Sequence, residues 1–401
     1  MTSGPNPEEL GPGSKLDRYE IIRAVAQGGM GAVWLGRFGG KHGFEKLVAL
    51  KTILPELAAD PRFHDMFLDE ARISQRIVHV NVAQILDLGE HAGTTFIVFE
   101  WVDGSSLEAI CRAAKARGEP LPLTVLLRVI ADACAGLHAA HELTNDAGEP
   151  LEVVHRDVTP DNVLVSDGGI AKIIDFGVAK ARYRLAGDTR SGLVKGTPQY
   201  MAPEQASGNE VDRRADIWAL GAVLYRALSG GPPFAARDDL AAFILNKEPL
   251  RELPGAVPDD VRAIVMKAMQ RHASDRYATA DDMRTALEAA IRSHGAAFSP
   301  AEISALLKKL SPPKRKSPSS EQVTLPDGEG VEARASASPY ALTELAGVAT
   351  QDPMAAMPTQ PAARSLPPPK DRQALFRGVI FIAVFVVVAA AVALLAPLFA
   401  N

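Results

Sequence analysis

Cysteine is scarce in this chain, basic residues are not in excess, and the beginning of the chain has no apolar run. The two cysteines among 401 residues, Cys111 and Cys134, have no CxxC spacing. We therefore expect reduced, buried thiols rather than a disulfide scaffold or a cysteine-based zinc site. A net charge of −5 gives no cationic surplus, so no nucleic-acid partner is expected. Met1–Ser14 is rich in glycine and proline, which excludes a secretory signal there.

A glycine-rich turn lies between two β-prone stretches near the start of the chain. Tyr19–Ala26 and Val33–Leu35 are apolar, and Gly28–Gly31 separates them. Glycines let a backbone approach phosphate groups because no Cβ is in the way. Such a turn alone is more often an ordinary loop. The short apolar stretch Val48–Lys51 follows it and ends in a lysine, so the later motifs decide between the two interpretations.

The stretch His155–Asn162 and the triplet that begins at Asp175 concentrate oxygen-bearing side chains. The Asp157 carboxylate could orient a substrate hydroxyl. Asn162 and Asp175 offer the amide and carboxylate oxygens that hold magnesium ions in phosphoryl transfer. Upstream, Phe63–Val78 has apolar residues at helical spacing. The pattern therefore predicts two polar loops that suit phosphate chemistry, with a helix earlier in the chain.

Taken in order, these motifs resemble protein kinases of the eukaryotic-like (Hanks) type over about residues 19–292. The resemblance implies an α+β, two-lobed fold. A small antiparallel β-sheet lobe with one helix would cover about 19–101, and a large, mainly helical lobe would cover about 104–292. It also implies transfer of the ATP γ-phosphate, with Mg²⁺, to protein substrates. Gly196–Glu204 resembles the substrate-docking segment of serine/threonine kinases, which makes those hydroxyls the expected acceptors.

The resemblance assigns a role to each matching residue. Asp157 would orient the hydroxyl, Glu70 would pair with Lys51, and Asn162 and Asp175 would hold the metal. The backbone of Glu100 and Val102, in a hinge between the lobes, would bind the base, with bulky Phe99 at the back of the pocket. The residues expected around the nucleotide are Ala26, Gly28, Gly29, Met30, Gly31, Val33, Ala49, Lys51, Glu100, Val102 and Leu164.

Other matches concern architecture and regulation. Arg276 is expected to pair with Glu204, and Asp216 to brace the catalytic loop. Arg156 would pair with a phosphorylated Thr189 or Ser191 in the loop before the docking segment. We expect another copy of the chain to add that phosphate. The alternative is that Thr189 and Ser191 are ordinary polar loop residues.

Two positions depart from the kinase pattern. Ala26 replaces the first glycine of the phosphate loop, which costs little if its φ is negative. Thr159 stands where serine/threonine kinases usually have a lysine that neutralises charge in the transition state. Its absence leaves open a catalytically impaired pseudokinase that acts as a scaffold. A kinase fold acting on a small molecule is a third hypothesis, which the docking segment disfavours. An active enzyme is preferred, because Lys51, Asp157, Asn162 and Asp175 are all present.

The flanking segments predict a membrane anchor. Residues 1–18 are expected to be disordered, and Ser299–Leu310, within 293–310, to form an accessory helix that is either docked or free. Residues 311–377, rich in Pro, Ser and Ala, are expected to form a linker.

Residues 378–400 carry no charged or polar side chain and are long enough to cross a bilayer core of about 30 Å. Lys370, Arg372 and Arg377 favour a cytoplasmic kinase domain on a single-pass inner-membrane anchor. Tethering would promote self-association and autophosphorylation.

Overall fold

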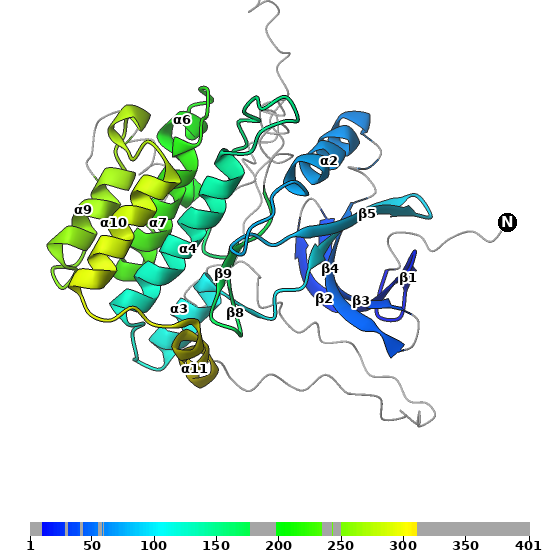
Figure 1. The fold of residues 1–401 in the computed structure, drawn as a ribbon, viewed down its shortest axis with the longest axis horizontal. Coiled ribbons are helices and arrows are strands. Elements are labelled where there is room, and N and C mark those ends of the chain that lie inside the picture. The colour runs from blue at the N-terminus through cyan, green and yellow to red at the C-terminus, as the bar shows by residue number, and fades with distance from the viewer. Residues whose placement is uncertain are drawn as a thin grey trace, which may run out of the picture. The chain divides into compact units, whose positions relative to one another are not determined.

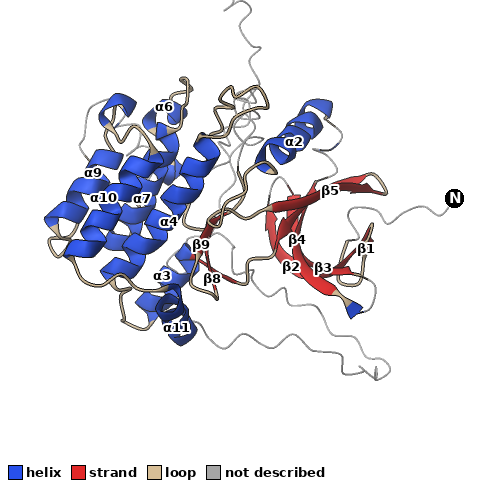
Figure 2. Ribbon diagram, in the orientation of Figure 1, coloured by secondary structure: helices blue, strands red, loops and turns tan. Residues whose placement is uncertain are grey.

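The computed structural model describes residues 10–28, 31–40, 43–54, 58, 60–176, 198–234, 243 and 250–310. Within helix α2 and at residue 198, some side chains are excluded from the description, namely those of Arg62, Phe63, Met66, Glu70 and Pro198. The described chain forms a lobe dominated by an antiparallel sheet and a lobe dominated by helices (Figures 1 and 2). The expected two-lobed α+β architecture is confirmed.

The small lobe is one antiparallel sheet with strand order β1-β2-β3-β4-β6-β5. It begins before residue 19, where we expected the domain to start, and the expectation that residues 1–18 are disordered is wrong for β1. Lys15 and Leu16 pair with the next strand, and Leu16 is only 1% exposed. The strands are β1 Lys15–Leu16, β2 Tyr19–Gly28, β3 Gly31–Gly39, β4 Glu45–Ile53, β5 Ile85–His91 and β6 Thr94–Glu100.

Side chains of the central strands alternate between two apolar clusters, because successive residues of a strand point to opposite faces. In β6, Phe96 and Val98 join a cluster on one face, whereas Ile97 and Phe99 join a cluster on the other. Helix α2, Pro61–Ser74, covers this second face through Phe67. The alternation explains why this part of β6 is buried although the sheet is only one layer thick.

The large lobe packs its helices around one core, in which Trp218 is fully buried. Figure 1 shows α4, α7, α9 and α10 side by side. Their apolar faces meet in the interior and form this core. The helices are α3 Leu107–Ala116, α4 Leu123–His141, α6 Pro203–Ala206, α7 Arg214–Ser229, α9 Asp259–Ala268, α10 Ala280–Ser293 and α11 Pro300–Leu310, with 3-10 helices at Pro198–Tyr200 and Ala273–Asp275.

A second, three-stranded sheet adjoins the two loops that contain Asn162 and Asp175. It consists of β7 Gly104–Ser106, β8 Val163–Ser166 and β9 Ala171–Ile173. The segment 79–83 lies beside β9: the Ala83 amide donates to the carbonyl of Ile173, and the Ile173 amide donates to the carbonyl of Asn81. The sequence between α2 and β5 is thereby fixed to the strand that leads into Asp175.

Helix α11 docks on the large lobe, which decides between the two alternatives for the accessory helix. Ile303 and Leu310 are buried in the large-lobe core. Ser304 Oγ donates to the carbonyl of Asp167 at 2.5 Å. Gly169 has a φ of +80°, and a Cβ there would meet the Pro300 carbonyl at 1.9 Å. The folded unit therefore continues to residue 310.

Among the described residues, one helix is long and apolar enough to cross a membrane by length and composition. This helix is α4, and most of it is buried inside the protein. The expected linker at 311–377 and the expected anchor at 378–400 lie outside the described residues, so both stay predictions.

Candidate active site

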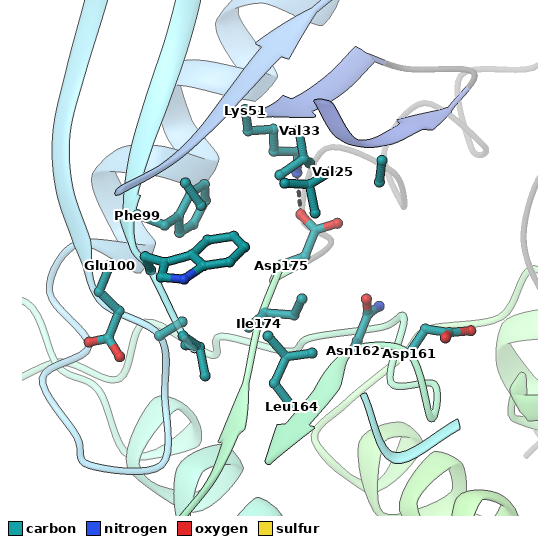
Figure 3. A pocket seen from close by; sticks show the side chains of 15 residues that line it. Val25, Val33, Lys51, Phe99, Glu100, Asp161, Asn162, Leu164, Ile174 and Asp175 are labelled. Atoms are coloured by element: carbon teal, nitrogen blue, oxygen red, sulfur yellow. Dashed lines mark hydrogen bonds and ion pairs between the residues drawn. The ribbon is translucent and has the colours of Figure 1, made fainter. Parts of the chain in front are cut away.

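A cavity of about 220 Å³ is lined by both lobes. Figure 3 shows Lys51 and Asp175 at one end, Phe99 and Glu100 at another, and Leu164 on the large-lobe side. The lining residues are Val25, Ala26, Val33, Ala49, Lys51, Ala83, Phe99, Glu100, Trp101, Val102, Asp161, Asn162, Leu164, Ile174 and Asp175. The cavity thus combines an apolar interior with a charged end.

Strand alternation delivers the small-lobe part of this lining. In β4, Val48 and Leu50 are buried in the small-lobe core. Ala49 and Lys51 have the opposite orientation and line the cavity. Ala26 also lines it, and its φ is not positive. The condition under which an alanine is tolerated in place of glycine is therefore met.

The glycine-rich turn is described only at its two ends. Gly28 pairs with Gly31 at the end of the β2–β3 ladder, and neither residue lines the cavity. A Cβ on Gly31 would meet the carbonyl oxygen of Thr52 at 1.8 Å, so close packing of β3 on β4 requires glycine there. Gly29 and Met30 lie outside the described residues.

Lys51 forms an ion pair with Asp175, joining the expected phosphate-binding lysine to the expected metal ligand. Their side chains are only 18% and 23% exposed, so water screens their attraction less than at the surface. We expected Glu70 to be the partner of Lys51. Glu70 belongs to α2, but its side chain lies outside the description, and that pairing stays a prediction.

Asp175 stands in a backbone conformation that side-chain-bearing residues rarely adopt, with φ of 61°. The surroundings hold it there: the amide of the preceding residue, Ile174, donates to the carbonyl of Asn162 at 3.0 Å, and the following Phe176 is buried. The Phe176 ring lies 4.7 Å from the His155 ring, centroid to centroid. The aspartate is thus aimed by a packed aromatic residue on one side and a hydrogen bond on the other.

The loop that carries Asp157 is organised around the His155 ring. His155 Nε2 donates to the carbonyl of Ile174 at 3.0 Å, whereas its Nδ1 accepts from the Asp157 amide at 3.3 Å. The Asn162 side chain donates to the carbonyl of Asp157 at 2.8 Å. Asp157 and Asn162 therefore belong to one hydrogen-bonded framework that includes Ile174, the residue before Asp175. Asp157 itself does not line the cavity.

Asp216 braces this loop from below, as expected. Its fully buried carboxylate accepts hydrogen bonds at 2.8 Å from the amides of His155 and Arg156 and from His141 Nε2. Burial acts to raise the pKa of Asp216, but the hydrogen bond from His141, the two nearby histidines and the His155 amide outweigh it and lower the pKa. The ionised carboxylate is the form that fits this site.

Arg156 has a φ of 64°, so its backbone is strained. Two contacts hold it in place: Asp216 accepts from its amide, and Gln205 Nε2 donates to its carbonyl at 2.6 Å. The expected phosphate acceptors Thr189 and Ser191 lie in residues 177–197, outside the described chain.

The expected pair between Glu204 and Arg276 is confirmed. Two parallel hydrogen bonds of 2.7 and 2.8 Å join them. The remaining donors of Arg276 reach the carbonyls of Gln270, Arg271 and Arg214. All five N–H groups of the guanidinium are thereby satisfied. The pair fixes the last residue of the expected docking segment to the large lobe.

Sequence reasoning missed several lining residues. Val25 and Ala83 are ordinary apolar residues by pattern, and only tertiary packing brings them to the cavity. Asp161 stands immediately before Asn162, a neighbour that could have drawn notice. Burial raises the pKa of Asp161, and the charge of Glu108 adds to this, whereas a hydrogen bond from Ser106 opposes it. Trp101 and Ile174 complete the set.

Thr159 is only 8% exposed, and its carbonyl accepts from the Asn162 amide at 3.0 Å. The residue that departs from the kinase pattern therefore belongs to the same turn as the expected metal ligand.

The donor set fits magnesium. Asn162 and Asp175 offer hard oxygen atoms at the charged end of the cavity. Within the described ranges, no group of three or more His, Cys, Asp or Glu side chains could hold a metal ion alone. Magnesium is commonly bound by one or two protein oxygens together with substrate phosphates and water, and this arrangement matches that pattern.

Comparison with known proteins places the geometry in context. The sequence model described as "Protein kinase domain" matches residues 19–288. The tyrosine-protein kinase MasK of Myxococcus xanthus is 45% identical over 294 residues, which cover 72% of this chain and 45% of MasK. The serine/threonine-protein kinase PknB of Mycobacterium tuberculosis is 34% identical over 287 residues, covering 69% and 43%.

A third relative and a solved structure agree with these matches. The serine/threonine-protein kinase Pkn1 of Myxococcus xanthus is 35% identical over 295 residues, covering 70% of this chain and 39% of Pkn1. The chain thus spans less than half the length of these relatives. The kinase domain of PknI from Mycobacterium tuberculosis superposes with a TM-score of 0.52 at 25% identity, covering 70% of this chain and 99% of that domain.

Proposed function

Because the chain belongs to the protein kinase family, we propose that it transfers the γ-phosphate of ATP to serine and threonine hydroxyls of proteins. The observation that carries this proposal is the convergence of Lys51, Asn162 and Asp175 on one cavity, beside a braced loop that holds Asp157. Cation and oxygen ligands at one end of an apolar cavity suit a polyphosphate attached to a flat base.

The chain's own residues would divide the work. The apolar side chains of Val33, Ala49 and Leu164 would enclose the base, and the hinge backbone at Glu100 and Val102 would bind its edge. Lys51 would contact phosphate oxygens, and Asn162 and Asp175 would hold magnesium, which supplies neutralising charge when bound. Asp157 would accept the proton of the hydroxyl and orient its oxygen.

The acceptor hydroxyl is proposed from the relatives named as serine/threonine kinases, such as PknB and Pkn1. Tyrosine is a second candidate, because MasK is named as a tyrosine kinase. Thr159 adds to this case, since tyrosine kinases also lack a lysine at the matching position. The scaffold alternative lacks support, because Lys51, Asp157, Asn162 and Asp175 are all present.

We further propose that the activity is regulated by phosphorylation. The strained backbone of Arg156 is fixed on both sides, so its side chain starts from a defined position. A phosphate on Thr189 or Ser191 would give it an anionic partner. The proposed donor of that phosphate is a second copy of the chain.

The proposed location is the cytoplasmic face of the inner membrane, through residues 378–400. Length, apolar composition and the preceding basic residues support it. Deleting 378–400 should leave catalysis intact but lower autophosphorylation at low protein concentration. An unchanged concentration dependence in lipid vesicles would remove the clustering proposal.

Phosphate transfer can be tested directly with the full-length chain. The purified protein is incubated with radiolabelled ATP, Mg²⁺ and a generic protein substrate, beside an Asp157→Asn variant. Label is expected only with the native residue, and equal labelling in both would refute the proposal. Acid hydrolysis of the labelled product then separates phosphoserine and phosphothreonine from phosphotyrosine. A predominance of phosphotyrosine would favour the second candidate.

A further inference from the structure

Glu100 and Lys172 form an ion pair across the two lobes. Glu100 is the last residue of β6 in the small lobe, and Lys172 is the middle residue of β9 in the large lobe. Lys172 Nζ lies 2.6 Å from Glu100 Oε1, and the two side chains are only 18% and 25% exposed. A pair so far withdrawn from water attracts more strongly than a surface pair.

The strand geometry explains why a lysine can stand there. The flanking residues Ala171 and Ile173 are 1% and 0% exposed and belong to the large-lobe core. Successive side chains of a strand point to opposite faces, so Lys172 leaves the core and reaches the hinge. Its Nζ also lies 3.5 Å from the carbonyl oxygen of Val82. One ammonium group therefore joins three segments that are distant in sequence.

The pair connects the cavity lining to the strand that leads into Asp175. Glu100 lines the cavity, and its carboxylate points away from Asp175 and Asn162 (Figure 3). Three residues after Lys172, the same stretch of chain delivers Asp175 to the opposite, charged end. The distance between the base-binding end and the phosphate-binding end thus depends on how Glu100 is held relative to β9.

We propose that Lys172 is a positioning residue for nucleotide binding. By holding Glu100, it fixes the hinge relative to the strand that presents Asp175, so both ends of the cavity match one nucleotide at the same time. This inference rests on the proposed function, because it presumes ATP as the ligand. Lys172 touches no reacting atom, so it acts on binding rather than on the chemical step.

A substitution series separates this role from a general structural one. Lys172→Met keeps the length of the side chain but removes its charge. It is expected to raise the KM for ATP, and the Kd for ATP, about tenfold while kcat changes less than about threefold, the pattern of lost ground-state binding. Glu100→Gln should act in the same direction. Because the two residues act as one pair, the double variant should be no weaker than the weaker single variant.

The reversed pair, Glu100→Lys with Lys172→Glu, should recover most of the lost affinity. Lys309→Met provides the control: that lysine pairs with Glu119 on the surface and is 64% exposed. Its KM and kcat should equal those of the wild type. Thermal melting of each full-length variant shows whether it folds. If Lys172→Met loses its cooperative transition, Glu100→Gln and the reversed pair decide the question.

The outcomes distinguish a failure of the proposed function from a failure of the positioning role of Lys172. A wild-type chain that neither binds nor uses ATP would refute the proposed function. A wild-type chain that uses ATP, with an unchanged KM in Lys172→Met and Glu100→Gln, would overturn only the positioning role. Additive losses in the double variant, no recovery in the reversed pair, or an equal fall in kcat and kcat/KM would also overturn it.

Discussion

Replacing Asp216 by asparagine should loosen the catalytic loop while leaving the nucleotide cavity in place. The buried carboxylate accepts three hydrogen bonds, from His155, Arg156 and His141. An asparagine has only one acceptor oxygen, and its NH₂ group would face at least one of these donors. In the orientation that keeps the contacts to both histidines, the Arg156 amide loses its partner.

The expected loss follows from that geometry. A hydrogen bond to a charged group contributes about 1.5–3 kcal/mol, and a buried amide without a partner costs about 1–3 kcal/mol. The left-handed conformation of Arg156 stores roughly 1–2 kcal/mol, which the lost contact no longer offsets. Because these contributions overlap, we expect the free energy of unfolding to fall by about 3–5 kcal/mol. Since Asp157 follows Arg156 directly, kcat should fall on the order of ten- to a hundredfold, with little change in the KM for ATP.

Urea unfolding and steady-state kinetics check both numbers. Asp281→Asn is the matched control, because its carboxylate is 42% exposed and pairs with Arg284 within one helix. Its stability should change by less than about 0.5 kcal/mol. A wild-type unfolding free energy or a wild-type kcat in Asp216→Asn would refute the bracing role.

The pH dependence of stability offers a second test, on the wild type and Asp216→Asn. The pKa of Asp216 is lowered in the folded state. Its contribution to stability is therefore complete above the unfolded value of about 3.9 and is lost as the pH falls through the lower folded value. The wild type should lose this stability on acidification below about pH 4, whereas Asp216→Asn should lose less over the same range. Parallel curves would contradict the assignment.

Two further substitutions test the architecture. Arg276→Lys keeps the charge but cannot form the two parallel hydrogen bonds to Glu204. The free energy of unfolding should therefore fall by about 3 kcal/mol in thermal or urea melts. A loss below about 0.5 kcal/mol would show that the paired hydrogen bonds are dispensable. Gly169→Ala and Gly148→Ala share a φ near +80°, but only the first Cβ would strike Pro300. Both should incur about 1 kcal/mol of backbone strain, and Gly169→Ala alone should release α11 to limited proteolysis; equal protease resistance would contradict the docking.

Local pattern predicted several elements of the fold, whereas the two-lobed arrangement was predicted from the resemblance to protein kinases. A short apolar stretch predicted the strand around Val48–Lys51, and helical spacing predicted the helix that contains Glu70. The motif around Asp157 and Asn162 predicted the loop that the structure holds together. These features are visible in sequence because backbone periodicity and short-range hydrogen bonds act over a few residues.

Pairs of residues distant in sequence could not be predicted from local pattern. The forked pair of Glu204 and Arg276 spans 72 positions, and only the resemblance to a family made it predictable. Neither the pairing of Lys172 with Glu100 nor the cavity position of Ala83 could be read from spacing. The docking of the helix that ends at Leu310 was open as well.

By itself, the sequence determined which chemical groups the chain carries and which local elements present them: the lysine that ends an apolar strand, the carboxylate and amide of one loop, and the aspartate that follows another strand. Tertiary structure decided which of these groups meet. Lys51 pairs with Asp175, and Lys172 ties the hinge to β9. The physical reason is that such pairs form only after packing of the two lobes has fixed the distance between their backbones, and no local periodicity encodes that distance.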